Sequence, residues 1–136
     1  MAQGYWLVKQ EPSKYAFADL VRDRRTMWEG VRNFQARNNL AAMRRGDPVL
    51  FYRSVEDPAV VGLCEVVKEA YPDPTADDPR WVAVDLQAVR ALATPVTLAR
   101  LKAEPALREL PLLRQSRLSV MPLPRSAFER IVKLGG

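Results

Sequence analysis

Short apolar runs that end at proline, glycine or charged residues set the pattern of this chain. Residues 5–10 are rich in aromatic and aliphatic side chains and stop at Glu11-Pro12, which predicts a strand closed by a proline turn. Residues 48–53 and 59–68 predict a hairpin of two buried strands, joined by residues 54–58. Later strands are predicted over residues 81–89 and 118–121, with a proline- and aspartate-rich loop over residues 71–80.

Helix-capping residues stand between these runs. Asn33 predicts the cap of a helix over residues 34–44, ended by Gly46, in which Phe34, Leu40 and Ala41 face inward. Further helical segments are predicted after Ser13, after Thr97, and over residues 106–110 and 125–133.

Strands separated by short helices and proline loops, without the long alternation of a doubly wound sheet, predict an α+β fold. We expect a small, strongly curved sheet or pseudo-barrel with short helices packed outside it. The chain has 136 residues, of which 48% are hydrophobic, so it can bury a substantial core. Residues 1–136 are therefore predicted to form a single domain.

The composition excludes several kinds of catalytic site. The chain has no histidine, which removes Ser-His and Cys-His nucleophilic sites and the usual zinc centres. Cys64 is the one cysteine and lies in an apolar run, so we expect it to be structural. The carboxylates of residues 56–57 and 73–78 stand in proline-containing turns that suit solvated loops better than a metal site. No catalytic residue, metal or cofactor is predicted.

No apolar run approaches the roughly 20 residues that span a bilayer. Residues 1–4 offer no basic segment leading into a signal sequence. We therefore expect a soluble, cytoplasmic protein without a membrane partner.

The net charge of +5 is concentrated in residues 21–45. This segment has seven arginines against Asp23 and Glu29, whereas acids and bases balance in residues 1–20 and in residues 46–136. It also contains a tryptophan, a phenylalanine and four amide side chains, so it offers phosphate attraction, stacking and hydrogen-bonding edges together. The alternative is a solvated basic helix face packed on one tryptophan.

Polar and aromatic groups fall at three predicted strand ends or turns: Lys9-Gln10, Trp28 with Arg32-Asn33, and Arg53-Ser54. If these ends converge at one mouth of a barrel, they make a pocket with an aromatic wall, groups for a base edge and cations for a phosphate. Such a pocket suits a nucleobase taken out of its stack. Each residue also has a structural alternative, since Trp28 could fill the core and Lys9 could lie along the rim.

Five ordered blocks of the sequence resemble the EVE domain family. The blocks lie within residues 5–12, 28–38, 46–54, 70–75 and 114–120, and they include Trp28-Glu29-Gly30-Val31-Arg32-Asn33 and Phe51-Tyr52-Arg53-Ser54. The resemblance implies a PUA-like fold, related to YTH readers of methylated adenine in RNA and to SRA readers of modified cytosine in DNA. It also implies binding without a chemical step.

The same resemblance assigns residues to a base pocket. Trp28 matches a cage tryptophan; Lys9, Gln10, Asn33 and Ser54 match the rim; and Tyr71 and Trp81 are two further candidate walls. YTH readers have a small polar residue where this chain has Gln10, and asparagines in place of Glu11-Pro12, so methyladenine is not the expected base. The resemblance thus favours a modified cytosine, such as 5-methylcytosine.

We therefore expect a non-catalytic reader that stacks a flipped, modified cytosine of DNA on Trp28. Its arginines would hold the nucleic-acid backbone: Arg32, Arg37, Arg44, Arg45 and Arg53. A reader this small would act through a separately encoded effector protein. Three alternatives stay open: a reader of a modified base in RNA such as tRNA, a nucleic-acid-processing enzyme with carboxylate-bound magnesium, and a module that binds an acidic protein.

Overall fold

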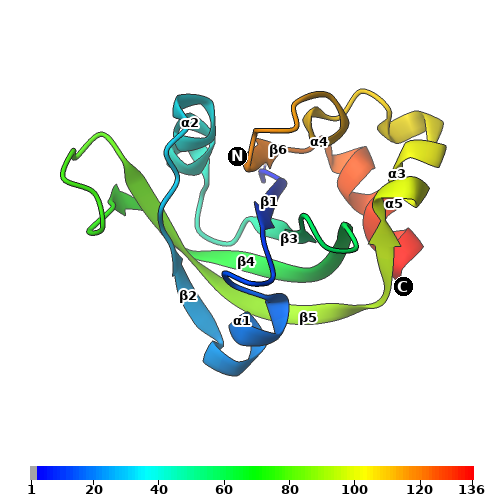
Figure 1. Ribbon diagram of the computed structural model, residues 1–136, viewed down its shortest axis with the longest axis horizontal. Helices are drawn as coiled ribbons and strands as arrows, with labels where there is room; N and C mark the ends of the chain where they lie inside the picture. Colours follow the sequence, from blue (N-terminus) through cyan, green and yellow to red (C-terminus); the bar gives the residue numbers. More distant parts are fainter. Residues whose placement is uncertain (1–2) are drawn as a thin grey trace.

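A six-stranded, strongly curved sheet forms the centre of the computed structural model, which describes residues 3–136 (Figure 1). The strand order is β2-β5-β4-β3-β1-β6, in which β1 and β3 run parallel and the other neighbouring pairs antiparallel. The predicted curved α+β sheet is confirmed. Its strands are β1 (Trp6–Gln10), β2 (Arg25–Trp28), β3 (Pro48–Arg53), β4 (Ala59–Pro72), β5 (Val82–Thr97) and β6 (Val120–Pro122).

Short helices pack around the sheet. In Figure 1, α2 lies near one end of the long β4–β5 pair, and α3, α4 and α5 gather toward the other. No helix within residues 3–136 is long and apolar enough to cross a membrane. The helices are α1 (Phe17–Asp23), α2 (Phe34–Ala42), α3 (Leu98–Ala103), α4 (Pro111–Arg114) and α5 (Arg125–Gly135), with a 3-10 turn at Pro105–Leu107.

Asn33 caps α2, as its sequence position predicts. Its Oδ1 accepts a hydrogen bond from the backbone N–H of Ala36 at 2.9 Å. The inward position predicted for Leu40 is confirmed. Those predicted for Phe34 and Ala41 are wrong, because both are exposed and the helix buries Ala36 instead. Phe34 faces outward because its ring stacks on that of Trp81, which is far away in the sequence.

Three predicted boundaries also shift. The Asp19 carboxylate accepts a hydrogen bond from the N–H of Ala16 at 2.8 Å, so the cap of α1 is Ala16, three residues after the predicted Ser13 cap. The loop predicted over residues 71–80 starts later, because Tyr71 and Pro72 still pair with β5. The strand predicted over residues 81–89 is longer, because β5 continues to pair with β4 as far as Thr97.

Three aromatic rings fill the core beneath the curve. The Phe51 ring makes edge contacts with Phe17 and Trp28, with ring centroids 5.4 and 5.6 Å apart. Gly62 permits this packing, since a Cβ added there would lie 2.3 Å from the Phe17 ring. The close approach of strand and ring therefore requires glycine.

Asp47 is a buried carboxylate that ties the start of the chain to the turn before β3. Its Oδ2 accepts from Trp6 Nε1 at 2.9 Å and from the Arg44 N–H at 3.0 Å, and its Oδ1 accepts from the Gly4 N–H at 3.2 Å. Only 3% of the residue is exposed, and the three donors offset the cost of burying its charge.

Replacement of Asp47 by alanine should lower the free energy of unfolding by roughly 3 kcal/mol, because three donors lose their acceptor in a largely buried place. Asp47→Asn keeps one side-chain oxygen and should cost less. Urea denaturation of the two variants measures both losses. An alanine variant as stable as the wild type would show that water replaces the carboxylate.

Candidate nucleic-acid interface

Two hollows open at the end of β1 and share Gln10. The first, which we call the Trp28 hollow, has a volume of about 270 Å³ and lies between the end of β1, the segment before α1, and β2. The second, the Lys9 hollow, has about 300 Å³ and lies among β1, the turn after β3, and the segment before β6. The Trp28 hollow is lined by Gln10, Lys14, Tyr15, Thr26, Trp28 and Glu29, among others; Lys9, Ser54, Val55, Ser116 and Arg117 line the Lys9 hollow.

Two of the three strand ends or turns singled out in the sequence, at Lys9-Gln10 and Arg53-Ser54, lie together. Because β1 and β3 are parallel, with Gln10 in register with Arg53, their carboxyl ends meet at the same edge of the sheet. The Ser54 N–H donates to the Gln10 carbonyl at 3.0 Å. The Gln10 Oε1 accepts from the Glu11 N–H at 3.0 Å, which fixes the side-chain amide at the junction of the two hollows.

Lys9 is held along the wall of its hollow. Its Nζ donates to the Ser116 carbonyl at 2.9 Å and lies 5.9 Å from the centroid of the Tyr52 ring. Burial lowers the pKa of this lysine. The hollow thus presents a positioned cation beside the Ser54 turn.

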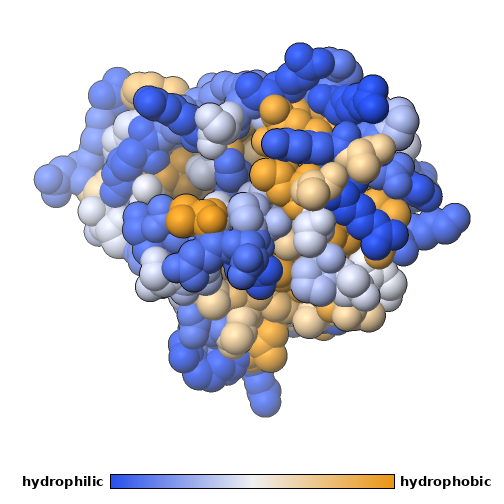
Figure 2. Space-filling model, turned by 45° about the vertical axis from the view of Figure 1, so that its right-hand side comes forward, coloured by the Kyte–Doolittle hydropathy of each residue, from blue (hydrophilic) through white to orange (hydrophobic). Residues whose placement is uncertain are grey.

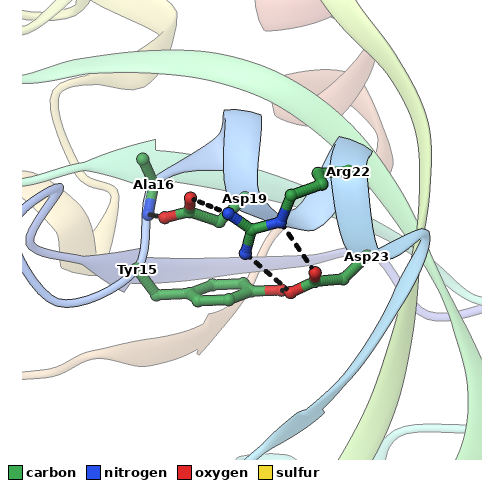
Figure 3. Close-up of polar contacts among 5 residues, drawn as sticks. All are labelled: Tyr15, Ala16, Asp19, Arg22 and Asp23. Atoms are coloured by element: carbon green, nitrogen blue, oxygen red, sulfur yellow. Dashed lines mark hydrogen bonds and ion pairs between the residues drawn. The ribbon is translucent and has the colours of Figure 1, made fainter.

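Trp28 and Tyr15 give the Trp28 hollow two aromatic side chains. Trp28 ends β2, is only 5% exposed, and therefore forms a floor with little free ring surface. Tyr15 comes from the segment before α1, and its Oη donates to Asp23 Oδ2 at 2.8 Å (Figure 3). Burial raises the pKa of the Tyr15 phenol, and the Asp23 carboxylate raises it further, so the hydroxyl stays protonated at neutral pH.

Sequence reasoning missed Tyr15. The position of Tyr15 is fixed by the far end of α1, where Asp23 accepts a hydrogen bond from the Tyr15 hydroxyl. Asp23 also forms an ion pair with Arg22 at 3.0 Å (Figure 3). Arg22 in turn contacts Asp19, which begins the helix. Tyr15 precedes the helix, so no helical or strand periodicity in the sequence marks it. The one sequence signal is its partner Asp23, eight residues later, at the end of the helix.

The other predicted walls lie elsewhere. Tyr71 donates to Asp85, which is in register with Met27, so it lies on the face of the sheet opposite Trp28. Burial and then this hydrogen bond raise the pKa of Tyr71 to about 12. Trp81 stacks on Phe34, with centroids 4.7 Å apart. The structure therefore brings neither Tyr71 nor Trp81 to the Trp28 hollow.

Asp73 links the segment after Trp28 to the loop before β5. Its Oδ2 accepts from the Gly30 N–H at 2.8 Å and from Arg32 Nη1 at 3.1 Å, and its Oδ1 accepts from the Thr75 hydroxyl at 2.6 Å. Burial alone would raise the pKa of this carboxyl, but the hydrogen bonds from Thr75, Gly30 and Arg32 lower it to about 2. Arg32 is thus engaged by a buried carboxylate.

The remaining predicted arginines differ in how free their charges are. Arg53 donates twice to the Asp57 carbonyl, at 2.8 and 3.0 Å, and so holds the turn after β3. Arg44 and Arg45 are exposed beside an open cleft of about 730 Å³, and their guanidinium groups form no ion pair within residues 3–136. Arg37 is partly buried at the second turn of α2.

The described residues show no group of three or more Asp, Glu, Cys or His side chains placed to hold a metal ion. Cys64 is fully buried, its Sγ lies 3.3 Å from the Val49 carbonyl, and burial raises the pKa of the thiol. Its placement fits the structural role predicted from the sequence.

Comparison with known proteins identifies the family. The profile of the EVE domain matches residues 4–134. The chain belongs to the EVE domain family. Mouse thymocyte nuclear protein 1 is 38% identical to it, over 96% of this chain and 73% of that protein.

Two solved structures place this EVE domain among its relatives. The crystal structure of human THYN1 in complex with 5-methylcytosine-containing DNA has a TM-score of 0.90 at 35% identity and covers 98% of each chain. The YTH domain of Zygosaccharomyces rouxii MRB1, in complex with N6-methyladenosine RNA, has a TM-score of 0.62 at 15% identity, over 97% of this chain and 86% of that one. The second likeness shows a shared fold alone, which agrees with the PUA-like expectation.

Acid should weaken this EVE domain through Asp73. Its folded pKa of about 2 lies below the ordinary value of about 3.9, so its contribution is present above pH 4 and is lost as the pH falls from about 4 to 2. Between pH 5 and pH 2, the wild type should lose about 2 kcal/mol more unfolding free energy than Asp73→Asn, which cannot titrate. Urea denaturation across this range tests the difference, and parallel profiles would contradict it.

Proposed function

We propose that this EVE domain binds a modified nucleobase, namely a flipped cytosine derivative of DNA such as 5-methylcytosine, in the Trp28 hollow. The observation that carries the proposal is the joint placement of Trp28, Tyr15 and Gln10 around one hollow at the mouth of the curved sheet. The Tyr15 ring provides a stacking surface, the buried Trp28 ring an apolar floor, and the Gln10 amide hydrogen bonds to a base edge. The complex of human THYN1 with 5-methylcytosine-containing DNA supports the choice of base and polymer.

The size of the hollow suits a small planar group. Its volume of about 270 Å³ lies just below the range of ligand pockets, about 300–1,000 Å³. A methyl group that fills space and displaces water contributes about 1–3 kcal/mol to discrimination. Gln10, at the junction of the hollows, is the group best placed to distinguish the base edge of cytosine from that of thymine.

The nucleic-acid backbone would be held by cations in the adjoining hollow at the end of β1 and by cations beside the cleft at the start of β1. Lys9 and Arg117 line the adjoining hollow, and Arg44 and Arg45 add exposed charge without carboxylate partners among the described residues. Arg32 and Arg53 serve this role less well, since Asp73 and the turn after β3 engage them. The proposed activity is binding without a chemical step. A separately encoded effector protein would act on the bound nucleic acid.

Trp28→Phe should reduce the preference for 5-methylcytosine over cytosine about tenfold, because the smaller ring leaves the methyl group poorly packed. Fluorescence anisotropy with matched DNA and RNA oligonucleotides measures this ratio and identifies the preferred polymer. Tyr5→Phe is the control, since it changes a partly buried aromatic residue that lines neither hollow. A folded Trp28→Phe protein with an unchanged ratio would refute the pocket assignment.

Arg44→Gln and Arg45→Gln should weaken binding to modified and unmodified DNA alike. Each change should reduce the slope of log K against log salt concentration by about 1, as expected for one lost phosphate contact. Arg108→Gln, which alters an exposed arginine outside residues 21–45, serves as the control. Loss of binding to modified DNA alone would contradict a backbone role.

A further inference from the structure

A second aromatic surface lies outside both hollows, where α2 begins. The Phe34 and Trp81 rings stack with centroids 4.7 Å apart and planes 24° apart. Phe34 is 51% exposed although it is a large apolar residue in the first turn of a helix. Figure 2 shows apolar areas between the hydrophilic ones on the visible face. Among the described residues, the large apolar side chains that are exposed are Val21, Phe34, Val55 and Val89, of which Phe34 alone is aromatic. A half-exposed stacked pair is therefore a distinct feature of this surface.

Three arginines surround the pair. The Arg32 guanidinium lies 5.8 Å from the Trp81 ring, and those of Arg37 and Arg80 lie 6.0 and 5.8 Å from the Phe34 ring. Arg32 and Arg80 have carboxylate partners, Asp73 and Asp78, at 3.1 and 2.7 Å.

Arg37 differs from the other two. Its side chain makes no hydrogen bond or ion pair within residues 3–136, and its buried Nε has no acceptor. A guanidinium left without an acceptor beside exposed aromatic rings is suited to an oxyanion supplied by a ligand.

We propose that Phe34 and Trp81 form a stacking platform for an unpaired nucleotide that flanks the modified base, with its phosphate held by Arg37. The inference rests on the proposed function, because it adds a second contact to the same nucleic acid. Base stacking on aromatic rings requires an accessible ring and a base that is not stacked in a duplex. The cation beside the rings favours a phosphate-bearing strand over a neutral peptide.

Chain geometry limits where that nucleotide lies. Phe34 follows Trp28 by six residues, so their Cα atoms lie at most about 20 Å apart. A stacked strand rises about 3.4 Å per nucleotide. The platform therefore accepts a base within about six nucleotides of the modified one, and the domain should favour a single-stranded or unpaired flank over a continuous duplex.

Phe34→Leu and Arg37→Gln test the platform, with Phe128→Leu as the matched control. Phe128 also packs against an aromatic ring, that of Tyr5 at 5.0 Å, but it lies on α5. Anisotropy titrations would compare one 5-methylcytosine oligonucleotide as a single strand and as a duplex. Phe34→Leu should weaken single-strand binding on the order of tenfold and leave duplex binding nearly unchanged. The ratio of 5-methylcytosine to cytosine affinities should stay at the wild-type value.

Equal single-strand binding by Phe34→Leu and Phe128→Leu would overturn the platform. A wild-type protein that does not distinguish 5-methylcytosine from cytosine would instead refute the proposed function, and a selective loss in Phe34→Leu would still support the platform. Photo-crosslinking of the wild type, with 5-iodouracil placed one to six nucleotides from the modified base, gives a test free of mutation. Crosslinks should appear at Trp81 or Phe34, and crosslinks confined to other peptides would overturn the inference.

Discussion

The buried carboxylate of Asp73 holds the segment on which both candidate surfaces depend. Its side chain binds Gly30 and Arg32, directly after Trp28, while its backbone N–H donates to the Trp81 carbonyl at 2.9 Å. A buried carboxylate is tolerated only where its oxygens are fully hydrogen-bonded, and here four donors meet them. One residue, through its side chain and its backbone N–H, thereby fixes the segment after β2 against the loop that carries Trp81.

The curvature of the sheet brings together the residues that line the Trp28 hollow. Three strands separate β1 from β2 in the sheet, yet Gln10 and Trp28 line the same hollow. The ring of Phe51 supports this curvature, since it contacts the rings of both Trp28 and Phe17. The base-sized hollow is therefore a product of core packing, and the residues that shape it include aromatic rings that a ligand never touches.

Local patterns predicted much of the fold and part of the site. The Asn33 cap depends on an N–H three residues away, and the ends of β1 and β3 depend on turn residues beside them, so short stretches of sequence carry both signals. Phe34 and Tyr71 were misplaced because their partners are remote or on another strand: Trp81 for the first and Asp85 for the second. From the sequence, an apolar residue at the start of a helix is expected to lie in the core, unless a stacking partner elsewhere in the chain is known.

The sequence by itself determined the family, the basic segment over residues 21–45 and the strand ends that carry Lys9, Gln10 and Ser54. These are properties of composition and of neighbours along the chain. Only the tertiary structure decided that Tyr15 joins Trp28 in one hollow, and that Trp81 leaves it to stack on Phe34. The physical reason is that sheet curvature and buried polar contacts such as those of Asp73 act between residues far apart in sequence, where no local periodicity records them.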